Sequence, residues 1–234
     1  MAVWCATGRI KDQYGNNAVG RSKSEVFWRG ISERIQIESD TSDPWEWRRI
    51  VFSVRGGQAA IGLPQDIVMG QAIQEYPAIL PELSPGPAPV GQTFNLRGPV
   101  RYNRLMIPLT TTQMVSFTSG LFAGQSLSTD WDGASLLLAQ VDTNNITVLS
   151  DRTRQLRSNN DSPFLKKFKL WTPINGNLRY ADSESGGAEG SSPYAAPGIR
   201  GIGDVYIVDL FTQLFAAPGN IRVTGQATAY WHEK

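Results

Sequence analysis

The side chains that most often carry enzyme chemistry are scarce in this chain of 234 residues. It has one histidine, His232, and one cysteine, Cys5. A zinc site built from several His and Cys ligands is therefore ruled out, and a histidine-based triad could use only His232. His232 is the third residue from the end of the sequence, and no serine or cysteine sits in a nucleophile-elbow motif. We therefore expect a structural or exposed histidine, no metal site and no cofactor.

Paired carboxylates are the remaining catalytic candidates. Asp130 with Asp132, and Asp182 with Glu184, have the residue types that glycoside hydrolysis uses, and Asp142 could join the first pair around calcium. These residues occupy turn-like contexts, and the spacing of an EF-hand is absent. Helix capping or a solvated loop is the simpler interpretation, so we expect no enzyme activity, with a sandwich-fold glycosidase as the alternative.

Basic residues interleaved with aromatic ones form three clusters and give a stronger signal. Cations that neutralise phosphates, beside rings on which bases stack, are how sequence-independent binding of single strands is built. A solvated strand face, or ion pairs between subunits, is the alternative. The predicted nucleic-acid-binding residues are Trp47, Arg48, Arg49 and Arg55, then Arg152, Arg154 and Arg157, and finally Lys167, Lys169 and Trp171.

The first cluster belongs to an expected strand over residues 45–54, which follows a turn signal at Asp43-Pro44. Ile50, Phe52 and Val54 alternate along it and predict an apolar face against the core. The opposite face carries Arg49, so it should meet solvent, another subunit or something negatively charged. We predict that Arg49 and Arg55 point to DNA or to a subunit boundary.

Similar alternation predicts the other strands. Gly30 is a candidate bulge in the strand over 25–38, and Glu33 is a charged misfit on its apolar face. Residues 131–141 are the only credible helix, and the proline-rich residues 56–102 are expected to form a long surface excursion. The strands are expected at 25–38, 45–54, 101–109, 114–122, 146–150, 164–171, 204–211 and 221–231. The predicted fold is all-β, a single eight-stranded jelly-roll sandwich with long loops and at most one short helix.

Composition agrees with one such domain. Twenty-three glycines and 14 prolines separate short apolar runs, a pattern typical of sandwiches and barrels. The net charge of +1 gives the protein no overall electrostatic attraction to nucleic acid or membranes, so any basic surface must be local. No apolar run of ~18 residues and no signal peptide occurs, which indicates an intracellular or particle-borne chain. We expect residues 1–24 to form an N-terminal arm and residues 25–234 to form the domain.

Several segments, taken in order and spacing, resemble the capsid protein of genomoviruses and, more faintly, geminivirus coat proteins. They cover most of residues 25–234. The segments are Phe27-Trp28-Arg29-Gly30-Ile31, the run from Trp45 to Phe52, Asp130-Trp131 through Asp142-Thr143, Val148 to Arg154, Ser158-Asn159-Asn160, Lys167-Phe168-Lys169-Leu170-Trp171, Leu178-Arg179-Tyr180, Gly203 to Tyr206, and Ala229 to Lys234.

This resemblance implies a jelly-roll capsid protein that self-assembles into a small icosahedral shell around circular single-stranded DNA. Its partners would be further copies of itself and that DNA, with no membrane and no small-molecule substrate, and its locations would be the virion and, during assembly, the host nucleus. Members of the family carry a basic N-terminal arm that contacts DNA and directs nuclear import, whereas residues 1–24 hold few basic residues. A jelly-roll lectin with exposed tryptophans as sugar platforms is the alternative.

Overall fold

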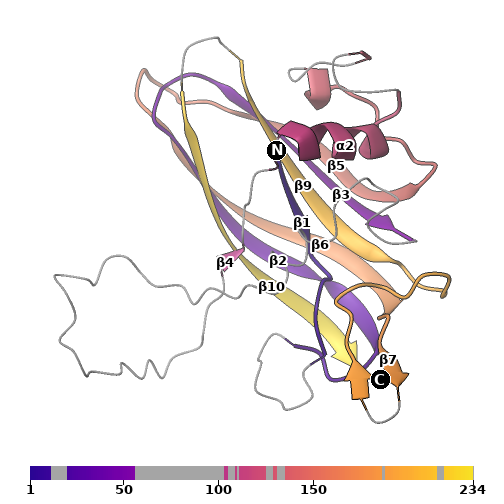
Figure 1. Cartoon of the computed structure of the whole chain (residues 1–234). Helices are drawn as coiled ribbons and strands as arrows, with labels where there is room; N and C mark the ends of the chain where they lie inside the picture. The colour runs from indigo at the N-terminus through magenta and orange to yellow at the C-terminus, as the bar shows by residue number, and fades with distance from the viewer. Residues whose placement is uncertain are drawn as a thin grey trace, which may run out of the picture.

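Two four-stranded antiparallel sheets form a sandwich (Figure 1). The computed structural model describes residues 1–11, 20–55, 103–104, 109, 111–124, 129–130, 135–185, 188–214 and 219–233. The first sheet has the order β1-β9-β3-β5, from β1 (Ala2–Cys5), β9 (Asp204–Gln213), β3 (Trp45–Val54) and β5 (Ile146–Leu156). The second has the order β4-β10-β2-β6, from β4 (Asn103–Arg104), β10 (Ile221–Glu233), β2 (Glu25–Ser39) and β6 (Leu165–Arg179).

Strands that follow one another along the chain belong alternately to the two sheets, so each connection crosses the sandwich. A small hairpin of β7 (Ser183–Ser185) and β8 (Ala188–Gly190) separates β6 from β9. The described helical segments are α2 (Thr111–Leu121) and the short 3₁₀ helix η3 (Ser135–Leu137), and neither is long and apolar enough to cross a membrane. The expected all-β sandwich is confirmed, and α2 is the one α-helix among the described residues.

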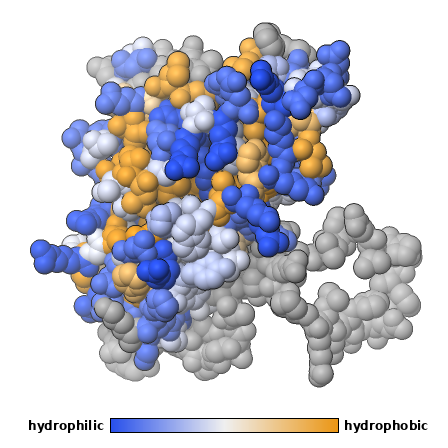
Figure 2. Space-filling view, turned by 180° about the vertical axis from the view of Figure 1, so that it is seen from behind, coloured by the Kyte–Doolittle hydropathy of each residue, from blue (hydrophilic) through white to orange (hydrophobic). Residues whose placement is uncertain are grey.

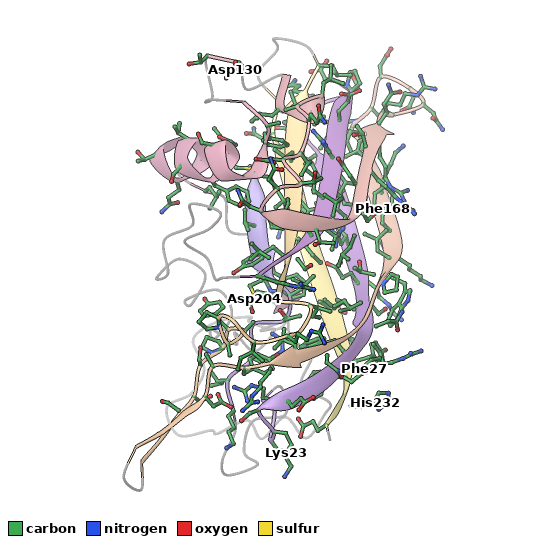
Figure 3. All side chains as sticks on the ribbon, turned by 90° about the vertical axis from the view of Figure 1, so that its right-hand side faces the viewer. Lys23, Phe27, Asp130, Phe168, Asp204 and His232 are labelled. Atoms are coloured by element: carbon green, nitrogen blue, oxygen red, sulfur yellow. The ribbon has the colours of Figure 1, made fainter. Side chains whose placement is uncertain are left out.

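Strands β1, β3 and β9 of the first sheet are buried on both faces, which makes three layers, whereas the edge strand β5 is mostly exposed. On one face, Ile50 and Phe52 of β3 pack in a cluster with Phe117 and Leu121 of α2. On the other face, Val51 lies between the two sheets, packed with residues such as Trp28 and Ile31 of β2. Figure 3 shows α2 on one side of the sandwich and Phe168 of β6 on the other.

This layering corrects the orientation expected for β3. The face of Ile50, Phe52 and Val54 does pack in a core, but that core lies under the helices. The face of Arg49 and Trp47 looks into the space between the two sheets instead of outward. The sequence of β3 shows one apolar face and one mixed face, but it does not show that the mixed face, with Arg49, lies between the two sheets.

Arg49 is balanced there by two carboxylates. Its guanidinium forms ion pairs with Glu33 of β2 and with Asp209 of β9, the latter at 3.1 Å, and both carboxylate side chains are fully buried. The indole N–H of Trp47 donates to the same Asp209 at 2.8 Å. Glu33, the misfit on an apolar strand face, therefore joins the second sheet to the first through Arg49.

Two helical assignments differ from expectation. Residues 114–122 were expected as a strand, but Thr111–Leu121 is helix α2, in which Phe117 and Leu121 bury one side at a spacing of four residues. The hydroxyl of Thr118 donates to the carbonyl of Met114 at 2.8 Å, so polar side chains bond within the helix. The helix expected over 131–141 is reduced to the three residues of η3, with residues 131–134 outside the described part.

The first residues of the chain form a paired strand where an N-terminal arm was expected. All four residues of β1 are buried, and the strand pairs with β9 through Ala2 opposite Asp209. Further on, Arg21 is buried, binds Asp182 at 2.5 Å and lies 3.8 Å from the ring centroid of Tyr180. The apolar run Val3-Trp4-Cys5 is a strand signal inside the segment that the rest of its sequence predicts to be an arm.

The remaining strands agree with the sequence wherever the structure describes them. Expected strands at 25–38, 45–54, 146–150, 164–171, 204–211 and 221–231 correspond to β2, β3, β5, β6, β9 and β10, and β5 and β6 are longer than expected. The pairing of β2 shifts register between Trp28 and Gly30, which confirms the bulge. Of the strand expected at 101–109, only β4 and Leu109 are described, and the excursion at 56–102 lies outside the described residues.

Candidate nucleic-acid interface

The third basic cluster lies on the outer face of the second sheet. Along β6 the side chains alternate, so that Lys167, Lys169 and Trp171 are exposed while Phe168 and Leu170 are half-buried toward the first sheet. The fifteen residues of β6 include four cations and no Asp or Glu. The outer face of this strand therefore carries positive charge that no carboxylate of its own strand offsets.

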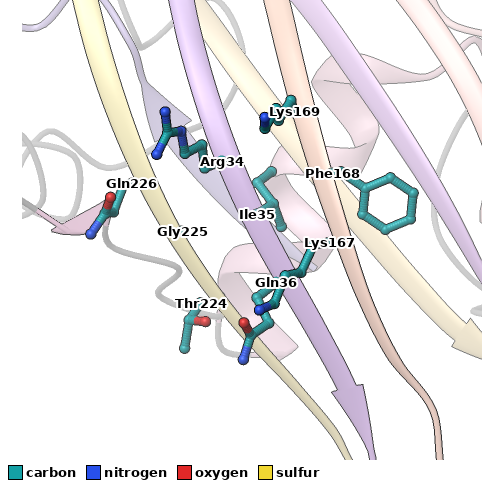
Figure 4. Close-up of a pocket in the computed structure, with 9 residues that line it drawn as sticks. All are labelled: Arg34, Ile35, Gln36, Lys167, Phe168, Lys169, Thr224, Gly225 and Gln226. Carbon is teal, nitrogen blue, oxygen red and sulfur yellow. The ribbon is translucent and has the colours of Figure 1, made fainter.

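Pairing with β2 and β10 brings further polar groups into line with these lysines. Arg34 stands opposite Lys169, Gln36 stands opposite Lys167, and Gln226 of β10 stands opposite Arg34. Figure 4 shows Arg34 and Lys169 at one level of the sheet, with Gln36 and Lys167 at the next. These side chains line a shallow hollow, which we call the cationic hollow.

An aromatic pair lies at the next position along the same face. Trp171 and Tyr230 meet edge to face, with ring centroids 5.6 Å apart, and their side chains are 54% and 48% exposed. Together with Arg29 and His232 they line a second hollow, which we call the aromatic hollow. His232 in turn stacks on Phe27, with centroids 6.4 Å apart.

Carboxylates are sparse on this face. Among the described residues, no Asp or Glu lines either hollow. Glu38 lies at one end of the face, opposite Arg222 of β10, and accepts a hydrogen bond from Gln36. Hydrophilic side chains, blue in Figure 2, gather over the middle of the face that looks away from α2.

The second basic cluster adjoins the third. Arg152, Arg154 and Arg157 are all exposed, the first two on β5 and the third just after it. The guanidinium carbon of Arg154 lies 5.6 Å from the ring centroid of Phe168, a cation–π distance that joins β5 to β6 across the gap between the sheets. The structure thus brings Arg154 of the second cluster to the edge strand β6, but on the side of Phe168, which faces the first sheet, and not on the outer face of Lys167 and Lys169.

The first cluster is different, and three of its four members are corrected. Trp47, Arg48 and Arg49 are buried, so in this fold they are not exposed contacts for DNA. Arg48 binds Asp151 at 2.6 Å and donates to the backbone carbonyls of Leu136 and Ala139, each at 2.8 Å. Arg49 forms ion pairs with Glu33 and Asp209 between the sheets, and Trp47 donates a hydrogen bond to Asp209. The polar groups of both residues therefore have partners inside the core and do not face a ligand.

Arg55 is exposed but lies apart from the other clusters. It shares a small hollow with Arg179 and Arg200 beside the loop around Gly198 and Gly203. Both glycines have φ of +76°, a left-handed conformation that glycine tolerates best. This hollow holds cations without the exposed aromatic rings that accompany Lys169 and Arg34.

The sequence did not single out Arg29, Arg34 or Tyr230. Their alternation marked Arg34 and Tyr230 as facing outward, but only the register of β10 against β2, and of β2 against β6, places them beside Lys169 and Trp171. Arg29 occupies the bulge of β2, whose displacement a regular alternation does not predict.

Two buried titratable groups, Cys5 and Asp204, lie inside the sandwich and line neither hollow. Burial raises the pKa of Cys5 to about 12, so its thiol stays protonated at neutral pH, which is the opposite of a reactive thiolate. Burial also raises the pKa of Asp204 to about 7. Asp182 is bound by Arg21, and in the described part of the chain no three His, Cys, Asp or Glu side chains group as metal ligands.

Comparison with known proteins adds no family. A scan against models of known protein families finds no match, and a search of curated protein sequences finds none.

Proposed function

We propose that this protein is a capsid subunit that self-assembles into a closed icosahedral shell around circular single-stranded DNA. The observation that carries the proposal is the outer face of the second sheet, where exposed cations and exposed aromatic rings share one surface. Cations bind phosphates of any sequence and rings stack on any base, so the surface suits a long, arbitrary single strand.

The distribution of charge supports this reading despite a net charge of only +1. Glu33 and Asp209 are buried and ion-paired with Arg49, so neither carboxylate belongs to the exposed surface. Arg152 and Arg154 of β5 are exposed, and so are Lys167 and Lys169 on the outer face of β6. Binding a polyanion requires such a local patch and not a high overall charge.

The fold and its surface also suit assembly. A jelly-roll winding of the two-sheet sandwich is the architecture that the resemblance to genomovirus capsid proteins implies. A closed shell needs several self-complementary contacts on each subunit. Large apolar side chains are exposed at separate places that could make such contacts: Leu138, Leu149, Leu165, Ile199 and Leu214.

A jelly-roll lectin is the second candidate, because Trp171 and Tyr230 could also serve as a platform for a sugar ring. The neighbouring cations distinguish the two ligands. Binding to phosphates weakens steeply as salt rises, whereas stacking on a neutral sugar does not depend on charge. The absence of Asp and Glu from the lining residues of both hollows, among those described, favours the anionic ligand.

The proposal is tested by purifying the protein and measuring particle formation and nucleic-acid content together. We expect closed particles by electron microscopy and single-stranded DNA protected from nuclease inside them. Replacing Arg154, Lys167 and Lys169 together with Gln should lower the protected DNA severalfold and leave subunit folding unchanged, because all three side chains are exposed.

Arg200→Gln, which removes an exposed cation outside both hollows, is the matched control and should leave the protected DNA unchanged. A protein that remains monomeric at high concentration would contradict the capsid function. Glycan binding that persists in high salt, without particles, would support the lectin instead.

A further inference from the structure

Trp171 is held in place by the shape of β2. Its indole lies against Gly30, where an added Cβ would stand 2.7 Å and 2.9 Å from two ring carbons of Trp171. Any larger residue at position 30 would displace the ring, so the absence of a side chain at Gly30 leaves the space that the indole occupies. Tyr230, which pairs with Gly30 from β10, meets the ring of Trp171 edge to face. The pair is thus a built aromatic platform and not a chance exposed side chain.

The bulge of β2 adds a cation to this platform. The register of β2 against β6 shifts between Trp28 and Gly30, which leaves Arg29 without a regular partner across the sheet. Arg29 is exposed and lines the aromatic hollow with Trp171, Tyr230 and His232. A planar, anionic ligand would therefore meet rings and a guanidinium together.

The cationic hollow continues from the platform in a straight line. On β6 the outward positions Lys167, Lys169 and Trp171 follow one another at steps of about 7 Å, twice the rise per residue of a strand. Arg34 of β2 stands beside Lys169. The line thus offers rings at one end and closely spaced cations at the other, along the direction of the strands.

We propose that this line binds a segment of single-stranded DNA in a fixed arrangement, with an unpaired base stacked on Trp171 and Tyr230. The phosphates that follow lie over Lys169, Arg34 and Lys167. This inference rests on the proposed function for the identity of the ligand, but it concerns one surface that can be tested without a shell. The positive charge of the line and the fixed rings of Trp171 and Tyr230 favour a nucleic acid over a neutral sugar.

The experiment separates the base from the backbone. Binding of a fluorescent oligothymidine is compared with binding of a strand of equal length in which the bases are absent but all phosphates remain. The wild-type protein should prefer the strand with bases by about tenfold, because base–aromatic stacking of this size is usual. Trp171→Ala should abolish the preference, Trp171→Phe should retain part of it, and Tyr230→Ala should reduce it.

Salt dependence identifies the phosphate contacts. Lys169→Ala and Arg34→Ala should each flatten the plot of log affinity against log salt by about 0.7, the value for one phosphate contact with a single strand. Trp171→Ala should leave that slope unchanged. Two matched controls, Arg200→Ala and Val115→Ala, remove an exposed cation and an exposed apolar side chain elsewhere and should change neither quantity.

Retention of the base preference in correctly folded Trp171→Ala and Tyr230→Ala proteins would overturn the inference. If that occurred in a protein that still forms particles around DNA, the capsid function would stand and only this site would fail. Loss of the preference in a protein that never forms particles would leave the site standing and remove the shell. Equal binding of neutral glycans at high salt would overturn the assignment of the ligand.

Discussion

Asp204 shows how a single residue can set the response of this sandwich to pH. It begins β9 with a fully buried side chain, labelled in Figure 3. One carboxyl oxygen accepts a hydrogen bond from the N–H of Ala195 at 2.8 Å, and the other has no hydrogen-bond partner among the described residues. Burial disfavours the charged form and raises the pKa to about 7, and the bond from Ala195 only partly opposes this.

The sign of the effect follows from proton linkage. Between the ordinary pKa of 3.8 and the folded value of about 7, the folded protein holds a proton that the unfolded chain has released. This group therefore lowers the free energy of unfolding as pH rises through that window, by up to about 1.4 kcal/mol per pH unit, and has no further effect above it.

Asp204→Asn tests this directly. The amide keeps an oxygen for Ala195 and cannot ionise, so the variant should gain stability over the wild-type protein as pH rises from 5 to 8. Urea unfolding at several pH values measures the difference, and Asp161→Asn, at an exposed carboxyl, is the control. A constant difference between Asp204→Asn and wild type at all pH values would show that Asp204 is ionised throughout.

At the scale of elements, the two sheets are joined by charge as well as by apolar packing. Arg49 of β3 lies between Glu33 of the second sheet and Asp209 of the first, with all three side chains buried. A buried pair adds little over an apolar substitute when both partners are removed. Removing one partner leaves a desolvated charge, and that is strongly destabilising.

Arg49→Met is therefore expected to lower the free energy of unfolding by about 3–5 kcal/mol. Adding Glu33→Gln to it should recover part of the loss, because one unpaired carboxylate is then neutralised. Arg34→Met, at the neighbouring exposed cation of β2, should change stability by less than about 0.5 kcal/mol. A loss below about 1 kcal/mol for Arg49→Met would show that the network is dispensable.

The strands themselves could be predicted because their alternation is local. Long strands such as β2 and β10 were predicted within a few residues, whereas α2 was missed because Phe117 and Leu121 are its only fully buried large apolar side chains and a short run is ambiguous. Alternation also divides β3 into two faces but does not say which one meets the other sheet. Trp47 and Arg49 were for this reason placed outside the core.

The candidate site could be predicted only where one strand carries it. Lys167, Lys169 and Trp171 belong to one exposed face of β6, so their spacing alone groups them. Arg34 and Tyr230 join them through the register of three strands, and that register depends on contacts between residues far apart in the sequence. Arg48 is the opposite case, because it lies in a basic run of the sequence but forms an ion pair with Asp151 of the same subunit. The sequence alone does not reveal that pairing.

At the scale of the whole molecule, the sandwich has two unlike sides. One side is covered by α2 and η3, which pack on the first sheet, and the other is the open face of the second sheet with its two hollows. A subunit of a closed shell must turn one surface toward the contents. Under the proposed capsid function, the exposed cations and the platform of Trp171 and Tyr230 make the face of the second sheet the one that should look inward.

A density map of the assembled particle with its contents tests the central claim most directly. We predict closed shells in which the outer face of the second sheet faces the interior, with nucleotide density against Trp171 and over Lys169. Particles whose second sheet faces outward and whose interior lacks nucleic acid, or a protein that never assembles, would contradict the account.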